Sequence, residues 1–337
     1  MRKRRRWRAP QFFAACGLAL AFAVPSAIAS PSDPLAQVRR VLATPDAQLD
    51  LARAKIAIDR LIDPRTDEAV TLRQLDSLTR AIQARIPVGA SRREKLRILV
   101  DSLAQPGPWN DARPFRYDLD DPFGEDIRNK LLATYLATRK GNCVSMPILF
   151  AILAQRIGLD ASLAVAPHHL FARAKVDGGQ WVNIEATSFG TKTDDSYRKE
   201  LNITATAIKS GIYLRTLSPK ESLGVTLETL LEHYSKSGAN EQRLAVADMV
   251  LKSDPRNVSA ILHRGSACGR LARKRYDGQP QQALTPAQQQ DLAALASCNS
   301  AAFAKAEALG WRAEQQKEKA KYRRGVNQAK LNQGRNP

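Results

Sequence analysis

The chain is poor in cysteine and histidine, short of acidic residues, and without a long apolar run beyond its first 30 residues. It contains 4 Cys and 4 His in 337 residues, and 33 Asp and Glu stand against 52 Lys and Arg. Because no later segment approaches the ~18 uninterrupted apolar residues of a membrane-spanning helix, a multi-span membrane protein is excluded. An apolar share of 44% with 25% charged residues excludes a wholly disordered chain, and the length suits about two domains.

The motifs of many cofactor-dependent enzymes are also missing. The sequence has no phosphate-binding loop and no dinucleotide fingerprint. His168 and His169 lack further ligands at a usable spacing, and the acidic run at residues 118–121 lacks the spacing of a calcium loop and is interpreted as a capped turn. We therefore expect no cofactor and no metal. Since nucleic-acid-binding motifs are missing too, we expect no nucleic-acid partner.

What is present at the beginning is the pattern of an export signal. Six basic residues within residues 2–8 precede a short apolar segment at residues 12–24, and residues 27–29 form an Ala-x-Ala cleavage site. The pattern predicts a periplasmic or secreted protein, although an uncleaved N-terminal membrane anchor remains an alternative. Cleavage after residue 29 would lower the net charge from +19 to +13, because six basic and no acidic residues leave. The remaining basic excess would suit a membrane surface or a cell-wall polymer.

The apolar pattern changes period along the chain, from helical spacing to alternation and back to helical spacing. This predicts an α+β fold, in which helical regions flank a core with an antiparallel hairpin. In the last helical region a helix ends at Asp254-Pro255 before the next begins, as in tetratricopeptide repeats (TPR). The predicted organisation is a signal peptide at residues 1–29, an N-terminal helical region at 30–105, a core at 106–217, a TPR-like helical region at 218–310, and a basic tail at 311–337.

Three residues of the core form a candidate thiol site. Cys143 lies at the predicted start of a helix, where unpaired amides and the positive dipole end stabilise a thiolate. His169 and Glu185 lie on two predicted strands that a turn around Asp177 joins. If one face of the sheet is buried, odd-numbered residues must pair with odd-numbered ones. A turn centred on Asp177 then places His169 directly opposite Glu185, with Cβ atoms about 5 Å apart.

Each of these residues taken alone has a simpler explanation. Cys143 fits a small buried apolar residue, and a strand histidine or carboxylate is often only hydrogen-bonded or solvated. Together they predict a nucleophile, a base and a carboxylate that orients the base.

Three segments carry a family resemblance: residues 139–147 (RKGNCVSMP), 167–171 (PHHLF) and 181–187 (WVNIEAT). They resemble the transglutaminase-like core of the bacterial SirB type, over about residues 110–217. The resemblance implies a papain-like fold with Cys, His and an acidic residue in this chain order, on a helix start and two adjacent strands.

By this resemblance Cys143 is the nucleophile, and His169 rather than His168 is the base. Glu185 falls where the superfamily more often has Asp. The implied function is that of an exported acyl-transfer enzyme, a protease or amidase that cleaves or transfers an amide or isopeptide bond of a protein or peptide. Two alternatives stay open. One is a non-catalytic exported scaffold that binds a protein partner through its TPR-like helices, and the other is a cell-wall amidase.

Three cysteines would remain in the mature chain, an odd number that leaves one thiol over in an oxidising compartment. Cys268 and Cys298 lie on two predicted helices that could be antiparallel neighbours. A bridge between them would close about 30 residues and stabilise the fold by ~3 kcal/mol in the chain-entropy model. Such a bridge would leave Cys143 free, whereas two buried, reduced thiols are the alternative.

Overall fold

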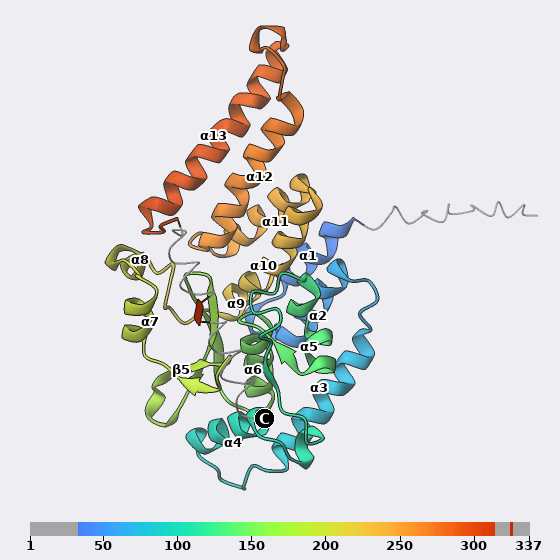
Figure 1. Cartoon of the computed structure of the whole chain (residues 1–337), viewed down its shortest axis with the longest axis vertical. Coiled ribbons are helices and arrows are strands. Elements are labelled where there is room, and N and C mark those ends of the chain that lie inside the picture. The colour runs from blue at the N-terminus through green and yellow to red at the C-terminus, as the bar shows by residue number, and fades with distance from the viewer. Residues whose placement is uncertain (1–32, 314–323, 326–337) are drawn as a thin grey trace, which may run out of the picture. The chain divides into compact units, whose positions relative to one another are not determined.

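The computed structural model describes residues 33–313 and 324–325 (Figure 1). The predicted export signal at residues 1–29 and most of the predicted basic tail at 311–337 lie outside these residues. Among the described helices, none is both long and apolar enough to cross a membrane.

The described chain begins with four helices, and short polar side chains cap the starts of the last three. Asp50, Asp67 and Ser91 each accept a hydrogen bond from the backbone N–H three residues further on, which is the usual role of a residue preceding a helix. The helices are α1 (Pro34–Ala43), α2 (Leu51–Ile62), α3 (Glu68–Gln83) and α4 (Arg92–Ala104).

A buried ion pair within α2 makes further hydrogen bonds to a later part of the chain, around residues 130–132. Lys55 Nζ lies 2.5 Å from Asp59 Oδ1, and both side chains are fully buried. Lys55 also donates to the carbonyl of Lys130, and Asp59 Oδ2 accepts from the backbone N–H of Leu132. These bonds attach α2 to the beginning of α5 (Leu132–Thr138).

The next segment leads to the central helix. After α5 comes β2 (Lys140–Gly141), which pairs in parallel with β1 (Arg116–Tyr117). The central helix α6 (Ser145–Arg156) follows, and every residue from Ser145 to Ala154 is buried. A helix that is apolar on all sides belongs inside a core, and α6 accordingly lies among the other elements.

A four-stranded antiparallel sheet packs against α6. Its strand order is β3-β4-β5-β6. The strands are β3 (Ala161–Ala166), β4 (His169–Lys175), β5 (Trp181–Glu185) and β6 (Gly190–Thr191). Together with the surrounding helices, this sheet has the α+β composition that the sequence predicts.

Both faces of the sheet are covered, whereas the pairing expected from the sequence requires only one buried face. Leu170, Ala172 and Ile184 belong to the core cluster that includes α6. Phe171, on the opposite face, is 0% exposed and packs in a second cluster with Tyr197. The covering layer is formed by residues around α7 (Asp194–Glu200) and α8 (Ala205–Ser210).

The register of the β4–β5 hairpin differs from the prediction by two residues. Arg173 pairs with Asn183 and Lys175 with Trp181, so the hairpin is centred on Gly178 rather than Asp177. The backbone N–H of Val176 donates to Gln180 to close the loop. Gly178 and the following glycine adopt φ angles of 78° and 80°, which only glycine adopts readily. The same residues still share each face, because a shift of two preserves the alternation.

The C-terminal part of the described chain is helical. Its elements are α9 (Pro219–Thr226), α10 (Glu228–Ser237), α11 (Asn240–Ser253), α12 (Val258–Tyr276) and α13 (Pro286–Ala308). The sequence correctly predicts that α11 ends at Asp254-Pro255 and that α12 begins at Val258, since Asn257 caps α12. The long helices α12 and α13 lie side by side (Figure 1).

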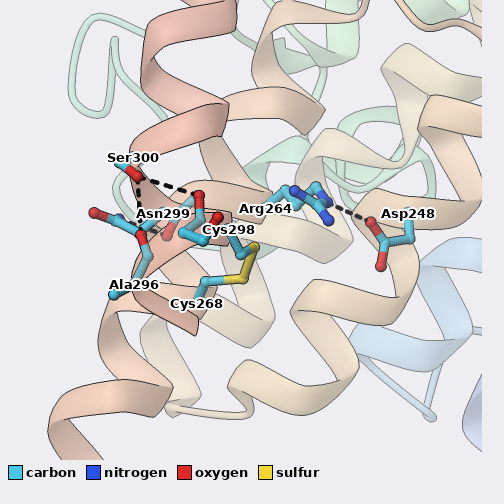
Figure 2. Close-up of a disulfide and its surroundings, with 9 residues drawn as sticks. Asp248, Arg264, Cys268, Ala296, Cys298, Asn299 and Ser300 are labelled. Carbon is cyan, nitrogen blue, oxygen red and sulfur yellow. Dashed lines mark hydrogen bonds and ion pairs between the residues drawn. A yellow bond between two sulfur atoms is a disulfide. The ribbon is translucent and has the colours of Figure 1, made fainter. Parts of the chain in front are cut away.

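A disulfide joins α12 to α13. Cys268 and Cys298 are bonded, with their Cα atoms 6.1 Å apart (Figure 2). Next to it Asn299 donates to the carbonyl of Gly265, while Arg264 pairs with Asp248 of α11. Of the two possibilities that the sequence leaves open, the structure has the bridge. Cys143 is the free cysteine among the described residues.

The helical regions and the sheet share their apolar cores. One core cluster combines residues of α2, α3 and α4 with α5, α6 and the sheet. A different core cluster combines residues of α1 and α2 with α9, α10, α11 and the start of α12. The described residues from Pro34 to 313 accordingly form one compact unit.

Candidate active site

The loop before α6 holds Cys143 through a reciprocal pair of hydrogen bonds. Asn142 Oδ1 accepts from the backbone N–H groups of Val144 and Ser145, at 3.0 and 3.2 Å. In return, Ser145 Oγ accepts from the backbone N–H of Asn142 at 3.1 Å. This is the pattern of a capping box, and it places half-buried Cys143 at the positive end of α6.

Glycine at position 141 is required by close packing. A Cβ atom built there would lie 2.5 Å from Tyr135 Cε2 and 2.7 Å from Met146 Cγ. Real Cβ atoms do not approach other heavy atoms so closely, so a larger residue would push the loop away from α5 and α6. The sequence Gly141-Asn142-Cys143 therefore combines a residue without a side chain, a helix cap and a thiol.

His169 connects Cys143 to Glu185. It is the first residue of β4, directly after His168, whose φ angle is 55°. His169 Nε2 lies 2.7 Å from Glu185 Oε2, and Cys143 lies close enough to His169 to raise the pKa of its imidazole. Because Nε2 faces Glu185, Nδ1 is the ring nitrogen that remains for the thiol. The structure thus brings together the three residues that the sequence singled out.

The Glu185 carboxylate has further partners besides His169. Tyr197 donates its hydroxyl to Oε2 at 2.9 Å, the same oxygen that faces His169. The hydroxyl of Thr187 donates to Oε1 at 2.6 Å, and the backbone N–H of Thr187 donates to the same atom at 3.3 Å. Both carboxylate oxygens are therefore held.

These contacts shift the pKa values of the pair in opposite directions. Burial works to lower the pKa of His169, but the hydrogen bonds and charges of Cys143 and Glu185 outweigh it and raise the pKa from 6.5 to about 9. Burial works to raise the pKa of Glu185, but the bonds from His169, Thr187 and Tyr197 lower it from 4.5 to about 2. At neutral pH the site therefore contains an imidazolium paired with a carboxylate.

Comparison with known protein families agrees with this geometry. Residues 69–223 match a model of the transglutaminase-like superfamily. The chain contains a transglutaminase-like domain. The comparisons with curated proteins and with solved structures found no match.

The transglutaminase-like domain extends further toward the N-terminus than the resemblance at about residues 110–217. The matched range begins near the start of α3 and includes α4. Packing explains the extension, because Leu75 of α3 and Leu99 of α4 lie in the same core cluster as Ile148 of α6.

Sequence reasoning missed one residue at the site of the transglutaminase-like domain. Tyr197 lies on α7, beyond the hairpin, and no local pattern indicates that α7 folds back over the sheet. Thr187 lies two residues after Glu185, so strand alternation predicts the same face for both, but no local pattern marks it as a partner of the carboxylate. The described residues contain no group of three or more His, Cys, Asp or Glu side chains arranged to hold a metal ion.

Proposed function

We propose that this protein is an exported thiol enzyme that cleaves or transfers an amide or isopeptide bond of a protein or peptide. The observation that carries the proposal is the contact of His169 with Glu185 at 2.7 Å, with Cys143 close enough to raise the pKa of the same imidazole. A papain-like core of the SirB type and a TPR-like partner-binding region at α9–α13 are parts of the same proposal. The disulfide supports export, since such bonds persist in oxidising compartments.

In the first half of the reaction the Cys143 sulfur attacks the carbonyl carbon of the amide. The imidazolium of His169 provides a counter-charge for the thiolate. As the tetrahedral intermediate collapses, the C–N bond breaks and His169 gives its proton to the leaving amine. The product is an acyl group bound to Cys143 as a thioester, with His169 now neutral.

In the second half neutral His169 removes a proton from water or from a second amine. That nucleophile attacks the thioester carbonyl, the C–S bond breaks, and the thiolate and imidazolium are restored. Water yields hydrolysis, and a lysine amine yields a new isopeptide bond. The backbone N–H of Cys143, at the positive end of α6, is our proposed donor to the developing oxyanion.

The decisive experiment is labelling of Cys143 with an electrophilic amide probe and with iodoacetamide near neutral pH. We expect Cys143 to react faster than an unstructured cysteine, and we expect His169→Ala to remove the difference. His168→Ala is the matched control, because it deletes a neighbouring imidazole. Mass spectrometry locates the label, and Cys143→Ala gives the background.

The competing non-catalytic scaffold makes a different prediction. If Cys143 reacts at the rate of an unstructured cysteine and His169→Ala changes nothing, the enzymatic proposal is wrong. If Cys143 instead reacts as expected, identification of the adducts that it forms in an exported-protein lysate would separate a peptide substrate from a cell-wall amide.

A further inference from the structure

We propose that Tyr197 is a positioning residue, which holds the Glu185 carboxylate so that one of its oxygens faces His169. The proposal rests on the proposed function, because it concerns the same site. It also accounts for how glutamate serves at a position where the resemblance more often has aspartate.

The register of the hairpin creates the need for such a residue. Continued toward the site, the observed pairing places Glu185 opposite Phe171, so Glu185 is a diagonal neighbour of His169. Diagonal neighbours on a sheet are about 7–8 Å apart, compared with about 5 Å for a direct pair. The extra methylene of glutamate supplies the missing reach, and it also adds a rotatable bond by which the carboxylate can turn away.

The two oxygens of Glu185 are held from two sides, which removes this freedom. Thr187 bonds Oε1 from the end of the same strand, and Tyr197 bonds Oε2 from α7. With Oε1 fixed by Thr187 alone, the carboxylate could still rotate about that contact. The second contact, from Tyr197, keeps Oε2 directed at His169 Nε2.

Tyr197 is itself fixed relative to the two strands that carry His169 and Glu185. Its ring is 1% exposed and stacks on Phe171 of β4 at a centroid distance of 4.4 Å. At the start of α7, Asp194 accepts from Arg173 of β4 at 2.6 Å and from Asn183 of β5 at 2.7 Å. β4 and β5 thus fix the position of α7, and Tyr197 of α7 in turn bonds the carboxylate of Glu185.

The phenol remains a hydrogen-bond donor throughout the working pH range. Burial and the charge of Glu185 raise the pKa of Tyr197 well above its ordinary value of 10. Tyr213, by contrast, lies in the same apolar layer but is not among the donors to Glu185. It provides a matched control for the loss of a buried hydroxyl.

The test compares Tyr197→Phe with Tyr213→Phe in the full-length chain. Tyr197→Phe retains the ring that stacks on Phe171 and deletes only the donor. In Tyr197→Phe we expect the pKa of His169, measured by NMR, to fall from about 9 toward 6.5. We also expect the rate of acylation by the amide probe to fall about tenfold, which is the size expected for the loss of one hydrogen bond to a charged group. Tyr213→Phe should leave both unchanged.

A double-variant comparison separates positioning from a general structural role. In a Glu185→Ala background, Tyr197→Phe should cause no further loss of acylation, because the group that it positions is gone. An equal loss in both backgrounds would overturn the proposal. An unchanged pKa of His169 would also overturn it. So would a raised pKa of His169, because it would mean that the Tyr197 hydroxyl only weakens the Glu185 carboxylate as a hydrogen-bond acceptor.

The outcomes also distinguish this inference from the proposed function. If wild-type Cys143 is not acylated, the proposed function fails, while the His169 titration still reports whether Tyr197 positions Glu185. If wild-type Cys143 is acylated and Tyr197→Phe matches the wild type in rate and titration, only the inference about Tyr197 fails.

Discussion

At the scale of single residues, the site depends on one buried ionic pair whose two members titrate at opposite ends of the pH range. The raised pKa of His169 means that its stabilising contribution is complete below pH 6.5 and is lost as the pH rises through about 9. The lowered pKa of Glu185 means that its contribution is present above pH 4.5 and is lost as the pH falls toward about 2. The pair therefore stabilises the fold most between these limits.

This dependence can be measured by thermal unfolding of the wild type and Glu185→Gln. We expect the wild type to be the more stable of the two at pH 5.5, and the difference to shrink at pH 9.5 because His169 has lost its charge. A difference that stays constant between these pH values would contradict the ionic pair.

The three proposed catalytic residues should differ in how much activity their loss removes. Cys143→Ala should abolish acyl transfer without unfolding the chain, since it deletes only a small group. His169→Ala should remove activity to a similar degree, because the two residues act as a unit. Glu185→Gln should cost less, roughly 10²-fold, because it removes orientation and charge but no reacting atom. Acylation rates measured with the amide probe would rank the variants, and a Glu185→Gln as inactive as Cys143→Ala would be inconsistent with this division of roles.

Much of the candidate site could be predicted from the sequence, for reasons visible in its residues. Cys143 precedes a helical pattern, and His169 and Glu185 occupy strand positions of the same parity, so local rules bring them to one side. The register could not be predicted, since it depends on which residue closes the loop, and both Gly178 and the glycine after it permit the turn. Tyr197 could not be predicted either, because its position results from packing between distant segments.

At the scale of elements, the beginning of α6 determines where the thiol lies. Asn142 is the acceptor for two backbone N–H groups at this end, and its side chain is almost fully buried. Asn142→Ala should destabilise the protein by about 1 kcal/mol, the usual cost of losing a helix cap, and should slow iodoacetamide labelling of Cys143.

Denaturant unfolding and labelling rates would test this prediction together. Asn257→Ala, at the cap of α12, is the matched control, because it should reduce stability to a similar degree without affecting the thiol. Equal labelling rates in wild type and Asn142→Ala would show that the cap does not position Cys143.

The sequence predicts where helices begin and end better than it predicts which elements cover each face of the sheet. The ends of α11 and α12 follow from Asp254-Pro255 and Asn257, which act on their immediate neighbours. The second layer over the sheet was missed, because α7 and α8 are short and carry little periodicity. Only their packing on Phe171 reveals which face they cover.

At the scale of the whole molecule, the disulfide lies apart from the proposed catalytic centre. Cys268 and Cys298 belong to a small cluster with Leu271 and Leu295, whereas His169 contacts Phe171 and Tyr197 of another. Replacing both Cys268 and Cys298 by Ser should lower the free energy of unfolding by ~3 kcal/mol, as expected for a closed loop of this length. Labelling of Cys143 in the folded variant should be unchanged.

Denaturant titration of wild type and the double Ser variant would measure the stability, and labelling in buffer would measure the reactivity of the thiol. A loss of Cys143 reactivity in a variant that remains folded would show that the α12–α13 pair influences the catalytic centre.

The way α2 is shared between two cores has a consequence for the order of folding. Ile56 packs into the cluster with α6, while Ala54 and Ile58 pack with α10 and α11. During synthesis α2 emerges about 190 residues before α11 is complete, so this side of α2 has only α1 as a native partner until most of the chain exists. Contacts of such long sequence separation form slowly. We therefore expect the described fold to be reached late and cooperatively, rather than by early completion of its N-terminal helices.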